Sequence, residues 1–67
     1  MLIELKDEYI TLAQLLKICN LVGSGGEAKA WLAEEKVLVN GEPENRRGRK
    51  LRSGDKVETG GETIEIK

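Results

Sequence analysis

The sequence Val37-Leu38-Val39-Asn40-Gly41 joins a short apolar run to an Asn-Gly pair, the strongest two-residue signal for a β-hairpin. We therefore predict a strand that ends at Val39 and a chain that turns back at Asn40. Pro43 cannot donate a hydrogen bond to a neighbouring strand. The returning strand should be short or should lie at the edge of a sheet.

The residues after this hairpin predict more strands. Turn signals at 53–55 and at 60–61 bound a strand over 56–58, and a closing strand follows over 63–66 with Ile64 and Ile66 facing inward. Between the hairpin and the first of these turns we expect a loop, with Leu51 entering the core. The second half of the chain thus predicts a small antiparallel sheet.

The residues before the hairpin predict two helices. The first begins at Thr11, which forms a capping box with Gln14, and runs to about Asn20. One face of this helix is apolar because its residues fall at the spacing i, i+3, i+4 and i+7, and this face should be core. It holds Leu12, Leu15, Leu16 and Cys19.

A second helix is predicted after the glycine-rich stretch 23–26. Ser24 and Glu27 have the spacing of another capping box, and the helix should end near Lys36. Trp31 and Leu32 share a stripe that packs either on the first helix or on a sheet. The segment Leu2-Ile3-Glu4-Leu5 is either a short edge strand or an N-terminal arm.

Together these elements predict an α+β fold, with two antiparallel helices packed on a small, mostly antiparallel sheet of three to five short strands. A chain of 67 residues has room for one domain, residues 1–67, with a small core. Its single cysteine cannot form an internal disulfide, which indicates a reducing compartment. The acidic N-terminus does not resemble a signal peptide, and no apolar run reaches the ~20 residues of a membrane span. We therefore expect a cytoplasmic protein that does not enter membranes.

A basic run, Arg46-Arg47-Gly48-Arg49-Lys50-Leu51-Arg52, packs five cations into seven residues. The remaining six cations stand against all 12 acids of the chain, which leaves a net charge of −6 elsewhere. A concentrated patch attracts phosphates even when the whole molecule is weakly acidic, and we expect the acids to face away from it. Arginine also matches phosphate oxygens with a planar fork of donors. The run is therefore either an RNA-binding loop or a solvated loop that maintains solubility.

The stretch Gly23-Ser24-Gly25-Gly26 is a second candidate site, because a helix start presents free N–H groups to an anion. Glu27 opposes this interpretation, since it places a carboxylate in the same field, and an ordinary capped turn between helices is the alternative. Lys17 either extends the basic surface or serves solubility. Tyr9 and Trp31 can stack on bases in principle, although Trp31 fits core packing better.

The order and spacing of these features resemble the S-four-type RNA-binding domain, also called the alpha-L RNA-binding motif. The likeness covers about residues 11–58 and is strongest to the short, stand-alone bacterial members, which share Gly25-Gly26-Glu27-Ala28-Lys29 and the stretch 45–51. Two positions depart from the broader family: Gly25 replaces the arginine of a Ser-Arg pair, and Thr11-Leu12-Ala13 replaces Arg-Leu-Asp. Contacts of those side chains do not transfer to this chain.

The resemblance implies a non-catalytic protein that binds structured ribosomal RNA and acts in ribosome assembly, with an early-helix basic position at Lys29. No histidine is present, Cys19 falls on an apolar stripe, and no acids have metal-ligand spacing, so we expect no enzyme, metal, cofactor or small-molecule substrate. A module that docks its basic loop on an acidic protein is the alternative. A monomer is the simpler oligomeric state. The expected RNA contacts are Ser24, Gly25, Gly26, Lys29, Arg46, Arg47, Arg49, Lys50 and Arg52.

Overall fold

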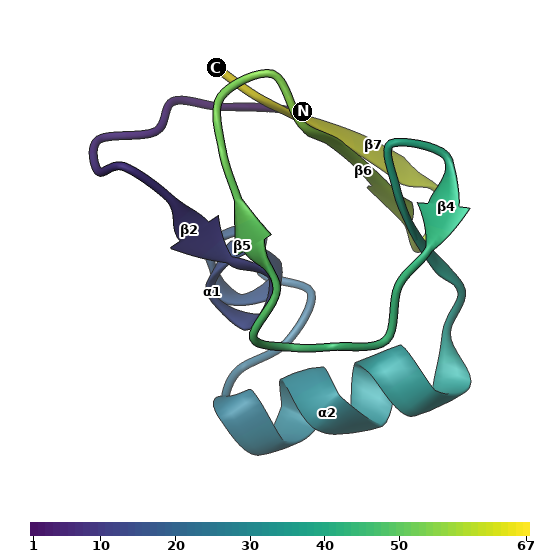
Figure 1. Ribbon diagram of the computed structural model, residues 1–67. Helices are drawn as coiled ribbons and strands as arrows, with labels where there is room; N and C mark the ends of the chain where they lie inside the picture. Colours follow the sequence, from purple (N-terminus) through teal and green to yellow (C-terminus); the bar gives the residue numbers. More distant parts are fainter.

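Two short helices and two β-sheets make up the protein in a computed structural model that describes all residues, 1–67 (Figure 1). The helices come early in the chain and most strands follow them, which confirms the predicted α+β class. Neither helix combines the length and the apolar composition that crossing a membrane requires. The elements are β1 (Leu2–Ile3), β2 (Ile10–Thr11), α1 (Leu12–Ile18), α2 (Gly25–Glu34), β3 (Val37–Val39), β4 (Glu42–Pro43), β5 (Lys50–Leu51), β6 (Lys56–Thr59) and β7 (Glu62–Ile66).

The larger sheet has the strand order β1-β7-β6-β3-β4 and is antiparallel except where β1 runs parallel to β7. Val39 pairs with Val57, which in turn pairs with Ile64, so one inward-facing row crosses three strands. These three side chains are almost completely buried. The predicted hairpin and the inward-facing isoleucines are thus confirmed, and Pro43 lies at the sheet edge as expected.

Asn40 and Asp55 link the hairpin to the turn before β6, and we call this pair the latch. The φ angles of Asn40 (52°) and Gly41 (85°) are both positive, as a type I′ turn requires. The Asn40 side chain donates to Asp55 Oδ1 at 3.0 Å and accepts from the N–H of Lys56 at 2.9 Å. Asp55 Oδ2 accepts from the N–H of Arg52 at 2.8 Å. Burial raises the pKa of Asp55, but the hydrogen bonds from Arg52 and Asn40, together with the charges of Arg49 and Arg52, outweigh it and lower the pKa overall.

The capping boxes explain where the helices begin. Thr11 and Gln14 exchange the two predicted hydrogen bonds, at 2.9 and 3.2 Å, and start α1. At α2, Ser24 accepts from the N–H of Glu27 at 3.2 Å, but the Glu27 carboxylate accepts from the N–H of Gly23 instead of Ser24. The predicted second box is therefore only half right. A Cβ at Gly23 would lie 2.7 Å from Glu27 Oε2, so the absent side chain makes room for this contact.

The apolar faces of the helices meet the larger sheet. All four predicted residues of the first helical face are buried, and burial raises the pKa of the Cys19 thiol, so this cysteine acts as a small apolar side chain. Trp31 Nε1 donates to Thr59 Oγ1 at 2.9 Å, and its ring lies against Gly60. Trp31 thus packs on the sheet, one of its two predicted positions. Helix α2 ends at Glu34, two residues before the end expected near Lys36.

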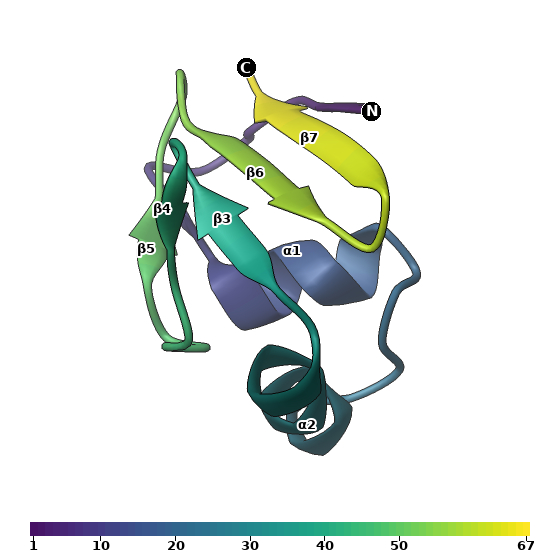
Figure 2. The same ribbon diagram turned by 90° about the vertical axis from the view of Figure 1, so that its right-hand side faces the viewer.

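The two helices cross steeply, whereas we expected them to be antiparallel. Figure 1 looks along α1 while α2 lies across the view, and Figure 2 looks along α2 with α1 lying across it beneath the larger sheet. The connection explains this direction. The N–H groups of Leu21 and Val22 both donate to the carbonyl of Leu16, and Val22 is buried, so the chain is held in the core before α2 begins.

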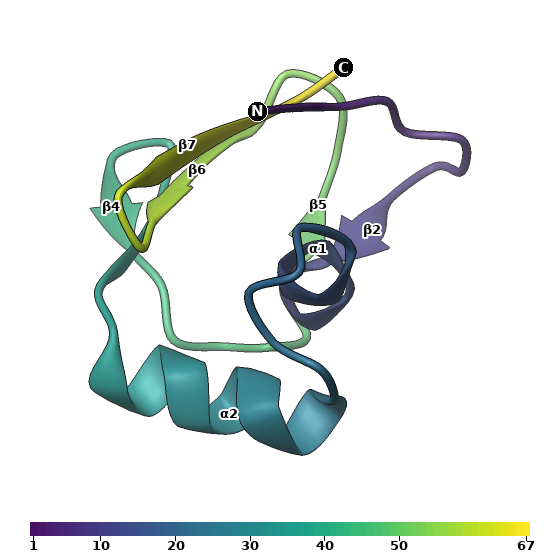
Figure 3. The same ribbon diagram turned by 180° about the vertical axis from the view of Figure 1, so that it is seen from behind.

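A second sheet, which the sequence did not predict, pairs β2 with β5. Ile10 lies opposite Leu51, and Thr11 lies opposite Lys50. Seen from behind in Figure 3, these strands lie beside α1, apart from the larger sheet. Part of the basic run is therefore a strand, and Leu51 is fully buried as predicted.

The latch predicts unequal effects of glycine at two asparagines. Asn40→Gly tolerates the positive φ but removes two side-chain hydrogen bonds, so it should lower the free energy of unfolding by about 2 kcal/mol. Asn20→Gly is the matched control, because Asn20 also has a positive φ (62°) but lies outside the latch, and its effect should stay within about 0.5 kcal/mol. Urea unfolding measures both values. Equal effects at the two positions would contradict the latch.

Candidate nucleic-acid interface

The basic run is attached to α1 through backbone groups. It crosses from β4 to β5 and passes α2 on the way (Figure 1). The N–H of Leu12 donates to the carbonyl of Arg49, and the N–H of Ala13 donates to the carbonyl of Arg47, each at 2.9 Å. These are first-turn N–H groups, which have no partner within a helix. The backbone of the run is thereby fixed, while the side chains of Arg46, Arg47, Lys50 and Arg52 remain exposed.

Glu44 lies inside the group of cations rather than facing away, which corrects our expectation for the acids. Its side chain is only 6% exposed. Arg46 donates to it through Nε at 3.1 Å and Nη2 at 3.0 Å, and Arg49 donates through Nη1 at 2.9 Å. The N–H groups of Asn45 and Arg46 donate as well, both at 3.0 Å. In the sequence Glu44 looks like any surface acid, and only its position two residues before the basic run indicates a contact with it.

Glu44 keeps its charge in this environment. The hydrogen bonds from the Arg46 side chain hold the pKa of the Glu44 carboxyl far below its usual value of 4.5. Burial acts in the opposite direction, but the Arg49 side chain and the N–H of Arg46 add to the lowering. One permanent negative charge, just outside the basic run, therefore lies beside the five positive charges of the run.

Arg47 connects the basic run to the glycine-rich start of α2. Its Nη1 donates to the carbonyl of Gly25 at 3.1 Å. The structure thus brings together the two candidate sites that the sequence predicted separately. Arg47 is exposed and has no carboxylate partner within hydrogen-bond distance, unlike Arg46 and Arg49.

The start of α2 is partly occupied by the protein itself. Ser24 Oγ and the N–H of Gly23 already have partners, whereas the N–H groups of Gly25 and Gly26 form no hydrogen bond within the protein. These two N–H groups can reach an anion, although the Glu27 carboxylate lies in the same turn. Lys29 is exposed on α2.

Tyr9 belongs to the cationic surface. The Nζ atom of Lys50 lies 4.9 Å from the centre of its ring, and the Cζ atom of Arg52 lies 5.9 Å away, so both cations contact the ring by cation–π interactions. Sequence reasoning left the role of Tyr9 open because these contacts depend on the pairing of β2 with β5. Within the protein, the ring thus contacts two cations of the basic run.

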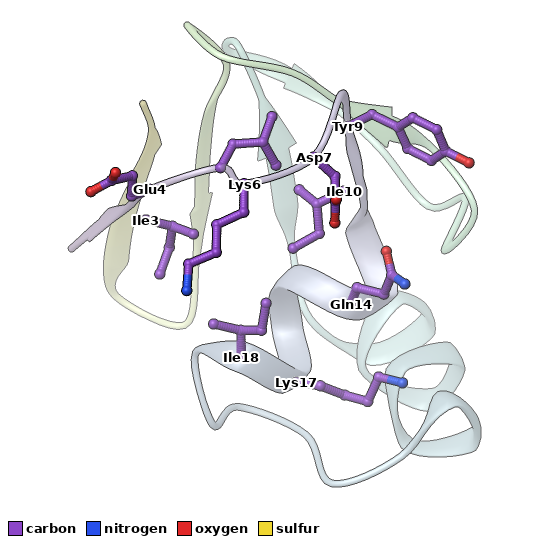
Figure 4. Close-up of a pocket in the computed structure, with 10 residues that line it drawn as sticks. Ile3, Glu4, Lys6, Asp7, Tyr9, Ile10, Gln14, Lys17 and Ile18 are labelled. Carbon is purple, nitrogen blue, oxygen red and sulfur yellow. The ribbon is translucent and has the colours of Figure 1, made fainter.

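A hollow of about 510 Å³ lies between residues 3–7 and α1. In Figure 4 the apolar side chains of Ile3, Ile10 and Ile18 surround it, while the ring of Tyr9 points away. Lys17 is exposed on α1 at its margin. The hollow is therefore a mainly apolar feature that shares Tyr9 with the cationic surface, and Lys17 lies at its margin.

Glu44→Gln should make the protein less stable near neutral pH, because an ionised acceptor of five hydrogen bonds becomes a neutral amide. The folded pKa of Glu44 lies below the unfolded one, so its contribution is complete above about pH 4.5 and is lost as the pH falls towards the folded value. We expect urea unfolding of the wild type and of Glu44→Gln, measured from pH 7 to pH 2, to show a difference in the free energy of unfolding that narrows below about pH 4.5. A difference that is independent of pH would contradict this charge state.

The comparisons with known proteins agree with this geometry. Residues 3–67 match the family described as S4 domain. The chain is also 56% identical over 59 residues to a protein of Bacillus subtilis (strain 168) named "Probable ribosome maturation protein RlbA", which covers 88% of this chain and 83% of that protein. The resemblance inferred from the helices, the hairpin and the basic run is confirmed, and this chain belongs to the S4 domain family.

Proposed function

We propose that this protein is a non-catalytic RNA-binding protein that binds structured ribosomal RNA, as a cytoplasmic monomer, during ribosome maturation. The observation that carries the proposal is the basic run, whose backbone is hydrogen-bonded to α1 and whose Arg47 side chain donates to the start of α2. Membership in the S4 domain family and the name of the Bacillus relative support RNA binding and a role in ribosome biogenesis.

The arrangement of the cations favours contacts with phosphates in a folded RNA. Arginine donors pair with phosphate oxygens, and a fixed set of them suits a target whose phosphates are also fixed. We assign phosphate contacts to Arg46, Arg47, Lys50 and Arg52, which are exposed, and a smaller contribution to the half-buried Arg49. Gly25 and Gly26 supply backbone N–H groups beside Ser24, and Lys29 extends the surface along α2.

Shape recognition is better supported than stacking on unpaired bases. Proteins that bind single strands offer free aromatic faces. Here Trp31 is packed against Gly60 and bonded to Thr59, and Tyr9 is in contact with two cations. The longest dimension of the molecule is 27 Å, so its footprint covers a limited part of an RNA surface.

The salt dependence of RNA binding tests the role of Arg47. If five phosphates are neutralised, log K should fall with log salt at a slope of about −3.5 on single strands to −4.5 on duplex, and Arg47→Gln should reduce that slope by about 0.7 to 0.9. Lys56→Gln is the matched control, because Lys56 lies on the face of the sheet away from the helices and the change removes the same charge. Fluorescence anisotropy with ribosomal RNA fragments measures both slopes.

Two results would contradict the proposal. One is an RNA affinity of the wild type no higher than that of an Arg46→Glu/Arg47→Glu variant with unchanged stability. The other is an equal loss of slope in Arg47→Gln and Lys56→Gln, which would mean that the net charge, and not the basic run, determines binding.

Sedimentation of a cell lysate distinguishes RNA from an acidic protein as the partner. At low salt the protein should sediment with ribosomal particles, and at high salt it should be released because its contacts are electrostatic. Nuclease treatment of the purified complex should release it as well. Retention on nuclease-treated particles would instead support docking of the basic run on a protein.

A further inference from the structure

An acid at the centre of an RNA-binding surface requires an explanation, because it lowers the positive charge that attracts the ligand. Glu44 accepts five hydrogen bonds and is almost buried. Glu42, two residues earlier, is exposed and forms no ion pair with an arginine. The two acids carry the same charge beside the same loop, yet only Glu44 contacts the guanidinium groups.

We propose that Glu44 is a positioning residue for RNA binding, which orients the guanidinium groups of Arg46 and Arg49 towards the phosphates of a structured RNA. This inference rests on the proposed function. It goes beyond it by assigning a favourable role to a negatively charged residue that RNA does not contact.

The geometry of Arg46 shows what is left for a ligand. A guanidinium group has five N–H donors, and Arg46 uses its Nε donor and one Nη2 donor on Glu44. The opposite end of the group, with the two Nη1 donors and the second Nη2 donor, remains free, and the side chain is 72% exposed. The carboxylate thus holds the Nε–Nη2 edge of the Arg46 guanidinium group. It turns the Nη1–Nη2 edge outward, where two N–H donors have the spacing that suits two phosphate oxygens.

Arg49 is held more deeply by the same carboxylate. Its side chain is 30% exposed, and its carbonyl accepts from the N–H of Leu12 at the start of α1. Glu44 therefore fixes the end of β4 relative to α1 through Arg49, while it orients Arg46. One acid sets the position of two cations that lie three residues apart in the chain.

Ordering these side chains before binding favours affinity. A long side chain that becomes immobilised only in the complex weakens binding by about 2- to 12-fold, and one that is already held in the free protein avoids most of that loss. Removing Glu44 has two opposite effects on RNA binding: the local positive charge rises, and the two arginines become mobile. The sign of the net change therefore separates positioning from simple charge.

The experiment compares Glu44→Gln with Glu42→Gln, each measured against a duplex-containing ribosomal RNA fragment and against heparin, a polyanion without A-form geometry. We expect Glu44→Gln to bind the RNA about 10-fold more weakly than the wild type, because two side chains lose their order. Its heparin binding should be unchanged or tighter. Glu42→Gln should bind both ligands as tightly as the wild type or slightly more tightly.

Two outcomes would overturn the inference. If Glu44→Gln binds RNA more tightly, as charge alone predicts, Glu44 only opposes binding. If its binding of RNA and heparin falls by the same factor, together with a lower Tm, Glu44 has a structural role and no role in positioning.

NMR of the arginine Nε–H groups keeps this test separate from the proposed function. In the free wild-type protein and in Glu42→Gln, the Arg46 Nε–H should exchange slowly with solvent, whereas in Glu44→Gln it should exchange like an exposed arginine. Rapid exchange in the wild type would overturn positioning even if RNA binds. If the wild type does not bind RNA at all, the proposed function fails, and with it the role of Glu44 in RNA binding, while slow exchange would still show that the carboxylate orders Arg46.

Discussion

Two backbone hydrogen bonds, from Leu12 and Ala13 to the carbonyls of Arg49 and Arg47, join the core of this protein to its basic run. A helix of seven residues such as α1 is not stable alone, and its first N–H groups need partners. The basic run supplies them, and its own residue Leu51 is buried in the core. The basic run is thus a structural element that α1 requires, rather than a loop added to a finished fold.

The cations of the run are held by different kinds of partner. Glu44 holds Arg46 and Arg49, the carbonyl of Gly25 holds Arg47, and the ring of Tyr9 lies beside Lys50 and Arg52. Each contact involves a residue outside the seven-residue run, so the positions of the charges are set by tertiary structure. A basic tail of the same composition would offer the same charge without this order.

Local signals in the sequence predicted the features that depend on neighbouring residues. The Asn40 hairpin and the capping box at Thr11 are formed by residues at most five positions apart, and the buried position of Leu51 followed from an apolar residue among cations. The pairing of β2 with β5 could not be predicted in this way, because each strand has only two residues and about 40 positions separate them. The crossing of the helices depended on how Leu21 and Val22 enter the core.

The candidate site likewise has features that the sequence predicted and features that only the structure shows. Its residue types were readable, since five cations in seven residues are conspicuous in any sequence. The place of Glu44 in the site could not be predicted from the sequence, because whether a carboxylate is buried among arginines depends on how β4 and the run meet in space. The link from Arg47 to α2 spans 22 positions and has no local signal.

The latch between Asn40 and Asp55 couples the evolution of the hairpin turn to that of the turn before β6. The two side chains share one hydrogen bond, and each also accepts from a backbone N–H, so losing either side chain leaves one polar group of the other without its partner. The Asn-Gly and Gly-Asp signatures should therefore be gained and lost together as such chains diverge. Because Asp55 also holds the amide of Arg52, drift in a hairpin 12 residues away changes how the last cation of the run is presented.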